Sequence, residues 1–130
     1  MRGVRFAPWI AVLAVAIALI QPARAEFLGV LPSDRSWVLG VTHNPNEFDL
    51  PAAVTVYAVD RTVEVIGVIT APSGQTTSQV FPKPGRAKRI MIEVDLPPGG
   101  SSTIFVNGAS PSTCESVRRG DTFRFVFNVQ

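Results

Sequence analysis

Hydrophobic and polar side chains alternate through the last nine residues before the C-terminal Gln130. The alternation places four large apolar side chains on one face, those of Phe123, Phe125, Phe127 and Val129. A period of two is typical of a half-buried β-strand, in which successive side chains point to opposite faces. Because each fully buried large apolar side chain contributes about 1.5–3 kcal/mol, this row is a strong local driving force for collapse. We expect other strands to cover it.

Several other segments carry the same period or a high content of β-branched residues. Residues 88–96 alternate cleanly, and the inward side chains are expected to be Ile90, Ile92, Val94 and Leu96. Further strands are predicted at residues 37–42, 53–59, 62–70 and 102–107, with short ones at 77–81 and 113–117. Between 53–59 and 62–70, the Asp60–Arg61 junction fits either a tight turn or a bend in one long strand. Residues 26–36 are interpreted as a connection rather than a strand, and residues 43–51 as a loop.

Turn-forming residues separate these segments at regular intervals, and no convincing helical period follows residue 25. The pattern predicts an all-β fold, an antiparallel β-sandwich of seven to eight strands, with a small β-barrel as the alternative. The run Leu96-Pro-Pro-Gly-Gly100, followed by a Ser/Thr-rich strand, resembles immunoglobulin-like and fibronectin-type sandwiches. The resemblance covers residues 88–107 and concerns architecture alone, so it implies no functional residues.

The N-terminus has the pattern of a secretory signal peptide. A basic start at Arg2 and Arg5 precedes the uncharged residues 6–20, and Ala23-Arg-Ala25 supplies small residues at the cleavage-determining positions. We therefore expect residues 1–25 to be removed and residues 26–130 to form a single exported domain, periplasmic or secreted. The apolar run is shorter than the ~20 residues that span a bilayer, so no transmembrane segment is expected after cleavage.

Cleavage changes the charge of the protein. The whole chain carries 12 basic and 10 acidic residues, but three of the basic residues lie before Glu26, which leaves 12 − 3 = 9 basic against 10 acidic. A nearly neutral domain is not attracted as a whole to nucleic acid, so no nucleic-acid partner is expected. Cys114 is the only cysteine and excludes an internal disulfide; it is a candidate for an intermolecular thiol or disulfide, or an incidental thiol.

Few residues are available for catalysis or metal binding. His43 is the only histidine, and its Pro/Asn-rich surroundings predict a solvated loop residue rather than a base beside Cys114 or a serine. One histidine and one cysteine do not make a transition-metal site, and no cofactor is expected. Glu93 and Asp95 share one face of a strand and are interpreted as a solvated row. The sequence therefore predicts a protein that is not an enzyme.

Basic residues gather in the connection before residue 90. Lys83, Arg86, Lys88 and Arg89 are the predicted binding residues, suited to an anionic envelope component or a protein partner. A second basic pair, Arg118 and Arg119, lies in another predicted turn. The expected function is a small exported, non-catalytic interaction module. The alternative is a structural subunit that assembles by strand pairing or through Cys114; the oligomeric state stays open.

Overall fold

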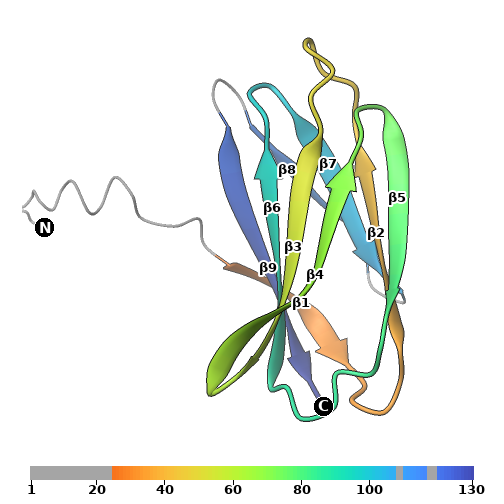
Figure 1. Cartoon of the computed structure of the whole chain (residues 1–130), viewed down its shortest axis with the longest axis vertical. Helices are drawn as coiled ribbons and strands as arrows, with labels where there is room; N and C mark the ends of the chain where they lie inside the picture. Colours follow the sequence, from red (N-terminus) through yellow and green to blue (C-terminus); the bar gives the residue numbers. More distant parts are fainter. Residues whose placement is uncertain (1–24, 108–109, 117–119) are drawn as a thin grey trace, which may run out of the picture.

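The described residues form nine strands and no helix (Figure 1). A computed structural model describes residues 25–107, 110–116 and 120–130. The strands are β1 (Ala25–Leu31), β2 (Trp37–His43), β3 (Ala52–Asp60), β4 (Thr62–Ala71), β5 (Gln75–Phe81), β6 (Arg89–Leu96), β7 (Ser101–Val106), β8 (Ser112–Glu115) and β9 (Asp121–Val129). The all-β prediction is confirmed, with more strands than the seven or eight expected.

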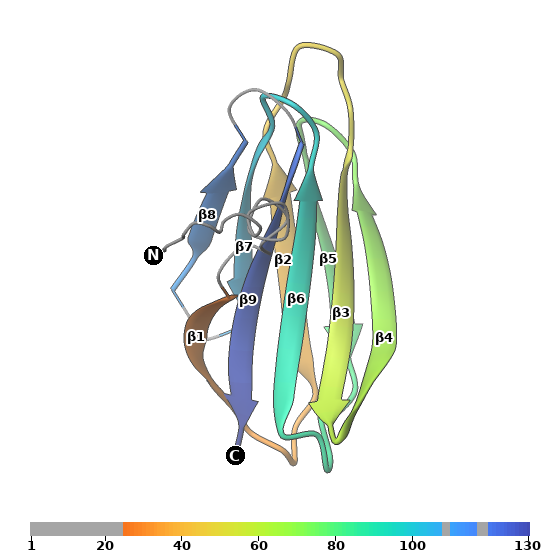
Figure 2. The same cartoon turned by 90° about the vertical axis from the view of Figure 1, so that its left-hand side faces the viewer.

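The strands make two packed sheets, which lie side by side in the view of Figure 1 and one in front of the other in Figure 2. The five-stranded sheet has the order β1-β9-β6-β3-β4, and the four-stranded sheet has the order β5-β2-β7-β8. All neighbouring strands are antiparallel except β1 and β9, which run parallel. Two mostly antiparallel sheets that share one apolar core are what a β-sandwich requires.

Residues from both sheets fill the space between them. The four inward positions predicted on β6 are all buried, and Phe125 and Phe127 of β9 lie beside them. The four-stranded sheet contributes alternate residues of β2 and β7, including Leu39, Val41, Ile104 and Val106. Trp37 stacks on Phe81 with ring centroids 4.6 Å apart. Since stability cannot come from an internal disulfide, this core has to supply it.

The prediction that residues 26–36 contain no strand was wrong. Ala25–Leu31 forms β1, which pairs with β9 from Ala25 opposite Arg124 to Leu31 opposite Val129. The register shifts between Phe27 and Gly29, where Gly29 has a φ of 142°. This irregularity breaks the alternation of side chains, and it removed the period that marks a strand in the sequence.

The Asp60–Arg61 junction is a tight turn between two paired strands. Asp60 is opposite Thr62, so β3 and β4 form a hairpin rather than one bent strand. Arg61 occupies the turn with a φ of 45°, in the left-handed region that non-glycine residues seldom adopt. A backbone conformation of this kind costs about 1–2 kcal/mol for an L-residue.

Two sequence predictions fall outside the described residues. The predicted signal peptide lies there except for Ala25, and so does the basic pair Arg118 and Arg119. Within the part of the chain that the structure describes, no helix is long and apolar enough to cross a membrane.

Candidate functional site

Three connections meet at one end of the molecule. They are residues 32–36 between β1 and β2, the turn between β3 and β4, and residues 82–88 between β5 and β6 (Figure 1, bottom). The Gly85 amide donates a hydrogen bond to the Ser33 carbonyl at 3.3 Å, and the Lys88 amide donates to the Val59 carbonyl at 2.8 Å. We call this region, with Arg89 at the start of β6, the basic end.

Six of the nine basic residues that follow Glu26 lie at the basic end. They are Arg35, Arg61, Lys83, Arg86, Lys88 and Arg89. Two acidic residues, Asp34 and Asp60, belong to the same connections and turn. The loop between β2 and β3, at the other end, carries Glu47 and Asp49. A nearly neutral domain is therefore electrically uneven along its long axis.

Two shallow depressions flank the Arg61 turn. One, of about 430 Å³, lies between the turn and the adjoining ends of β6 and β9 and is lined by Arg61, Lys88, Arg89 and Asn128. The other, of about 440 Å³, lies on the β5–β6 side and is lined by Arg61, Thr62, Glu64 and Arg86. Asp60 borders both. A ligand in either depression would meet cationic side chains from at least two separate connections.

Three of the four predicted binding residues, Arg86, Lys88 and Arg89, line these depressions. Lys83 is exposed in the same connection but lines neither. Sequence reasoning missed Arg61, because its place beside Arg86 and Lys88 depends on the pairing of β3 with β4 and β6. That Arg61 borders both depressions makes it the centre of the candidate site.

The cations of the basic end are mostly unpaired. Among the described residues, its ion pairs within 4.0 Å comprise only the 3.9 Å contact between Arg35 and Asp34, both strongly exposed. Exposed like charges repel one another by roughly 1 kcal/mol at 4 Å in water and less in salt. An anion bound among them would relieve this repulsion, and the planar guanidinium groups of Arg61 and Arg86 can bind a carboxylate or phosphate through two hydrogen bonds.

His43 is not the solvated loop residue that the sequence predicted. It is the last residue of β2 and is 0% exposed. Its Nε2 lies 2.9 Å from the Leu50 carbonyl oxygen, and its Nδ1 lies 2.7 Å from the Ser102 Oγ. Because a carbonyl oxygen only accepts hydrogen bonds, Nε2 carries a proton; in the neutral imidazole Nδ1 is then the acceptor, and the Ser102 hydroxyl donates to it. Asn46 completes this arrangement with an amide-to-carbonyl bond to Leu50 of 2.7 Å.

The His43–Ser102 pair resembles a base beside a hydroxyl, but both residues are 0% exposed. Neither lines the depressions described above. The pair instead ties the loop between β2 and β3 to β7, through the Leu50 carbonyl on one side of the imidazole and Ser102 on the other. A substrate would have no path to this hydroxyl without local opening of the sandwich.

Cys114 lies on β8, opposite Ser102 of β7. Its side chain is 5% exposed, and the thiol contacts the Ser102 carbonyl oxygen at 3.6 Å. Burial raises the pKa of the Cys114 thiol to about 11, which keeps it protonated and unreactive at neutral pH. An intermolecular disulfide stays a prediction, and forming one requires β8, an edge strand, to expose this side chain.

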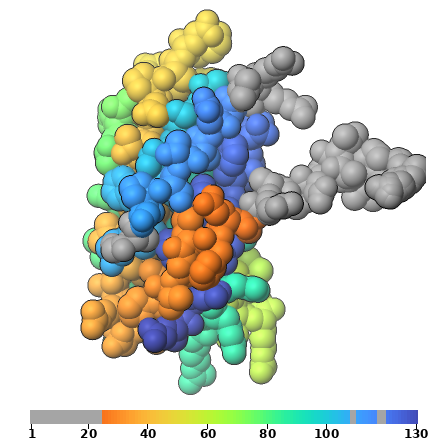
Figure 3. Space-filling model, turned by 180° about the vertical axis from the view of Figure 1, so that it is seen from behind, coloured from red at the N-terminus to blue at the C-terminus, as the bar shows by residue number. Residues whose placement is uncertain are grey.

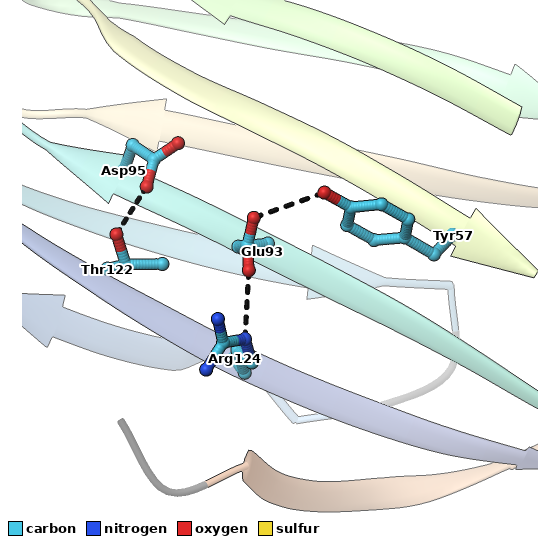
Figure 4. A network of polar contacts seen from close by, with 5 residues as sticks. All are labelled: Tyr57, Glu93, Asp95, Thr122 and Arg124. Atoms are coloured by element: carbon cyan, nitrogen blue, oxygen red, sulfur yellow. Dashed lines mark hydrogen bonds and ion pairs between the residues drawn. The ribbon is translucent and has the colours of Figure 1, made fainter. Parts of the chain in front are cut away.

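Glu93 is held in a polar network on the outer face of the five-stranded sheet (Figure 4). The Arg124 Nε donates to Glu93 at 2.8 Å, and the Tyr57 hydroxyl donates to the same carboxylate at 3.2 Å. Partial burial, together with the Glu93 charge, raises the pKa of Tyr57 above its ordinary value. Beside them, Thr122 donates to Asp95 at 2.5 Å. Glu93 is thus paired and partly buried, whereas Asp95 is exposed as the sequence predicted.

The described residues contain no group of three or more His, Cys, Asp or Glu side chains placed to hold a metal ion. Comparison with known proteins finds no family that matches the chain, no matching curated protein and no matching solved structure.

Proposed function

We propose that this protein is a small, non-catalytic interaction module that binds an anionic group of a protein or envelope component at its basic end. The observation that carries the proposal is the position of Arg61, between two depressions that also contain Arg86, Lys88 and Arg89. Cations from three separate segments converge there without carboxylate partners within 4 Å among the described residues. Such convergence is the usual basis for recognising carboxylates and phosphates.

The conformation of Arg61 supports the same interpretation. Glycine or asparagine would occupy a turn with a φ of 45° more easily than arginine does. A strained residue at an exposed turn is often found where a side chain takes part in binding. Arg61 is therefore proposed to contact the ligand directly.

The proposal also includes export of the protein and an immunoglobulin-like or fibronectin-like architecture. The leader sequence of residues 1–25 supports export to the periplasm or beyond the cell. Two packed sheets with mostly antiparallel strands support a general immunoglobulin-like or fibronectin-like architecture, in which connections at the ends of the sheets commonly bind partners. The burial of His43 and Ser102 supports a module without a catalytic centre.

Binding of a fluorescent acidic decapeptide, followed by anisotropy, tests the proposal. The Arg86→Gln/Lys88→Gln variant removes two positive charges from the basic end. We expect it to weaken binding at least about tenfold, because each hydrogen bond to a charged group is worth roughly 1.5–3 kcal/mol before screening. Binding of the unaltered protein should also weaken steeply between low and physiological salt.

The matched control is Gln75→Glu/Gln79→Glu, which changes the net charge by the same amount at exposed positions of β5. It should bind the peptide within about twofold to threefold of the unaltered protein if location rather than net charge decides affinity. Equal losses of peptide affinity in the two variants would reject a specific anion site at the basic end. Failure of the unaltered protein to bind the peptide saturably would reject it as well.

A second candidate function, a subunit that assembles by strand pairing, is favoured by the β4 edge. β4 is ten residues long, ends the five-stranded sheet and exposes Val63, Val65 and Val68. Long edge strands with apolar side chains are templates for pairing with another strand. Amide hydrogen exchange at high protein concentration tests this candidate: pairing would slow exchange along β4, and unchanged exchange there would dismiss it.

A further inference from the structure

Four apolar side chains and the ring of Tyr57 form one continuous row across the outer face of the five-stranded sheet. The strand register places Val65 opposite Tyr57, Tyr57 opposite Met91, Met91 opposite Val126, and Val126 opposite Phe27. Each of the five strands contributes one residue, and Figure 2 shows these strands side by side in front of the other sheet. We call these five residues the apolar row.

The apolar row points away from the core. Its central members alternate with buried neighbours on their own strands: Met91 lies between Ile90 and Ile92, and Val126 lies between Phe125 and Phe127. At the two ends of the row, Val65 is 53% exposed and Phe27 is 58% exposed. Val63, Val68 and Val30 add further exposed apolar surface beside it. A patch that spans a whole sheet is more than the scattered apolar residues of an ordinary surface.

From this register and the charges beside it, we propose that the outer face of the five-stranded sheet packs against the same face of a second copy of the protein. The two sheets would be related by a two-fold axis that lies along the apolar row. The apolar row lies outside both depressions of the proposed anion site, although the two surfaces share Arg89. The proposed contact involves side-chain packing rather than pairing of β4 edges.

The charges on either side of the row select this axis. On β6, Arg89 lies two residues before Met91 and Glu93 lies two residues after it. A two-fold axis along the row reverses the strand direction, so Arg89 of each copy faces Glu93 of the other. On β9, the same operation brings Arg124 opposite Asn128. Because Arg124 bonds Glu93 of its own chain at 2.8 Å, each Arg89 faces a Glu93–Arg124 pair rather than a free carboxylate.

Another in-plane arrangement fails on charge. A two-fold axis along β6, the central strand, would bring Arg89 against Arg89 and Glu93 against Glu93. Facing like charges at an interface are destabilising. The strands of two packed sheets usually cross at about 30°. At this angle, a residue two positions from the row is displaced by only about 3–4 Å from its partner in the other copy. The long Arg89 side chain can therefore reach Glu93 of the other copy across a twisted interface.

The size of the face fits a weak dimer. Five strands spaced about 4.8 Å apart and roughly 25 Å long give a footprint near 600 Å² per copy. Stable complexes typically bury about 800 Å² per partner, and weak ones bury less. We therefore expect a dissociation constant in the micromolar range, roughly 1–100 µM.

Sedimentation equilibrium of the protein purified from the exported fraction, after expression of the full chain, tests this proposal. Phe27→Arg introduces a charge into the apolar row and should weaken dimerisation at least about thirtyfold. Phe48→Arg is the matched control, because Phe48 is 69% exposed but lies in the loop between β2 and β3. It should leave the dimerisation constant within about twofold to threefold, as expected for substitutions outside an interface.

Charge exchange tests the symmetry. Arg89→Glu alone and Glu93→Arg alone each create two like-charge contacts in the proposed dimer, so each variant should be largely monomeric. Mixing the two variants should restore dimers, because every contact between the two different chains then joins opposite charges. Circular dichroism melting of each variant checks that Arg89→Glu and Glu93→Arg remain folded.

The outcomes separate this proposal from the others. Dimers that persist in Phe27→Arg would overturn it, as would protein that stays monomeric up to about 500 µM, well above the expected range. Single variants that fail to recombine as mixed dimers would refute the axis. The Arg86→Gln/Lys88→Gln variant should dimerise normally, so failure of the anion site leaves this test unaffected.

Discussion

Replacing Ser102 with alanine tests whether the buried His43 arrangement is a structural support. The Ser102 hydroxyl is the 2.7 Å donor to His43 Nδ1, and both residues are 0% exposed. In the Ser102→Ala variant, Nδ1 keeps no donor and no access to water. Leaving a buried acceptor unsatisfied costs about 1–3 kcal/mol, in addition to any space left by the missing oxygen.

The expected loss is measurable by thermal and urea unfolding. A change of 1 kcal/mol shifts the melting temperature by about 4–8 °C for a domain of 60–100 residues, so a loss of about 1–3 kcal/mol predicts a decrease of roughly 4–24 °C. Thr103→Ala is the control on the same strand, because Thr103 bonds Thr113 at 3.0 Å in an exposed position. That variant should change the unfolding free energy by less than about 0.5 kcal/mol.

A double-mutant cycle strengthens the test. His43→Phe/Ser102→Ala replaces both partners with apolar groups, so its loss should be smaller than the sum of the two single losses. Unchanged stability in Ser102→Ala, or strictly additive losses, would refute the inference that this hydrogen bond supports the loop between β2 and β3.

Three further predictions concern other parts of the fold. The pKa of the Cys114 thiol is near 9 in the unfolded chain and about 11 in the folded protein. The free energy of unfolding, compared with that of Cys114→Ala, should therefore be unchanged below pH 9 and fall by about 2 kcal/mol by pH 11. Urea unfolding at each pH measures this difference. Gly40→Ala should destabilise by about 1–3 kcal/mol, because the new Cβ would overlap the Phe105 ring; most of the loss should vanish with Phe105→Ala in the same chain. Arg124→Ala should cost about 0.5–1 kcal/mol by removing the 2.8 Å bond to Glu93, and high salt should shrink this cost.

The alternation of apolar and polar side chains predicted the core of the sandwich, because the direction of each side chain depends only on its position within its own strand. The inward residues of β6 were all found buried, from Ile90 to Leu96. The same period on β2 also marks His43 as an inward-facing position. His43 continues the series Leu39 and Val41 by one more step, but the following Asn and Pro residues led to its assignment as a loop residue.

Features that depend on pairing between strands could not be predicted in this way. The sequence did not predict β1, because its register shifts at Gly29 and this shift interrupts the alternation of inward and outward side chains. Arg61 joins the predicted binding residues only through the β3–β4 hairpin, and the sequence alone fits either a hairpin or one bent strand at this junction. The apolar row similarly takes single residues from five strands, such as Tyr57 and Met91, and no segment of sequence contains enough of it to stand out.

Nuclear magnetic resonance mapping of the anion-binding surface tests the central claim most directly. The ¹⁵N-labelled protein would be titrated with the acidic decapeptide while backbone amide shifts are followed. The proposed site predicts saturable shifts concentrated at residues 60–61, 83–89 and 128. Shifts that never saturate, or that concentrate in the loop of residues 44–51 at the opposite end, would contradict the assignment of the basic end as the binding site.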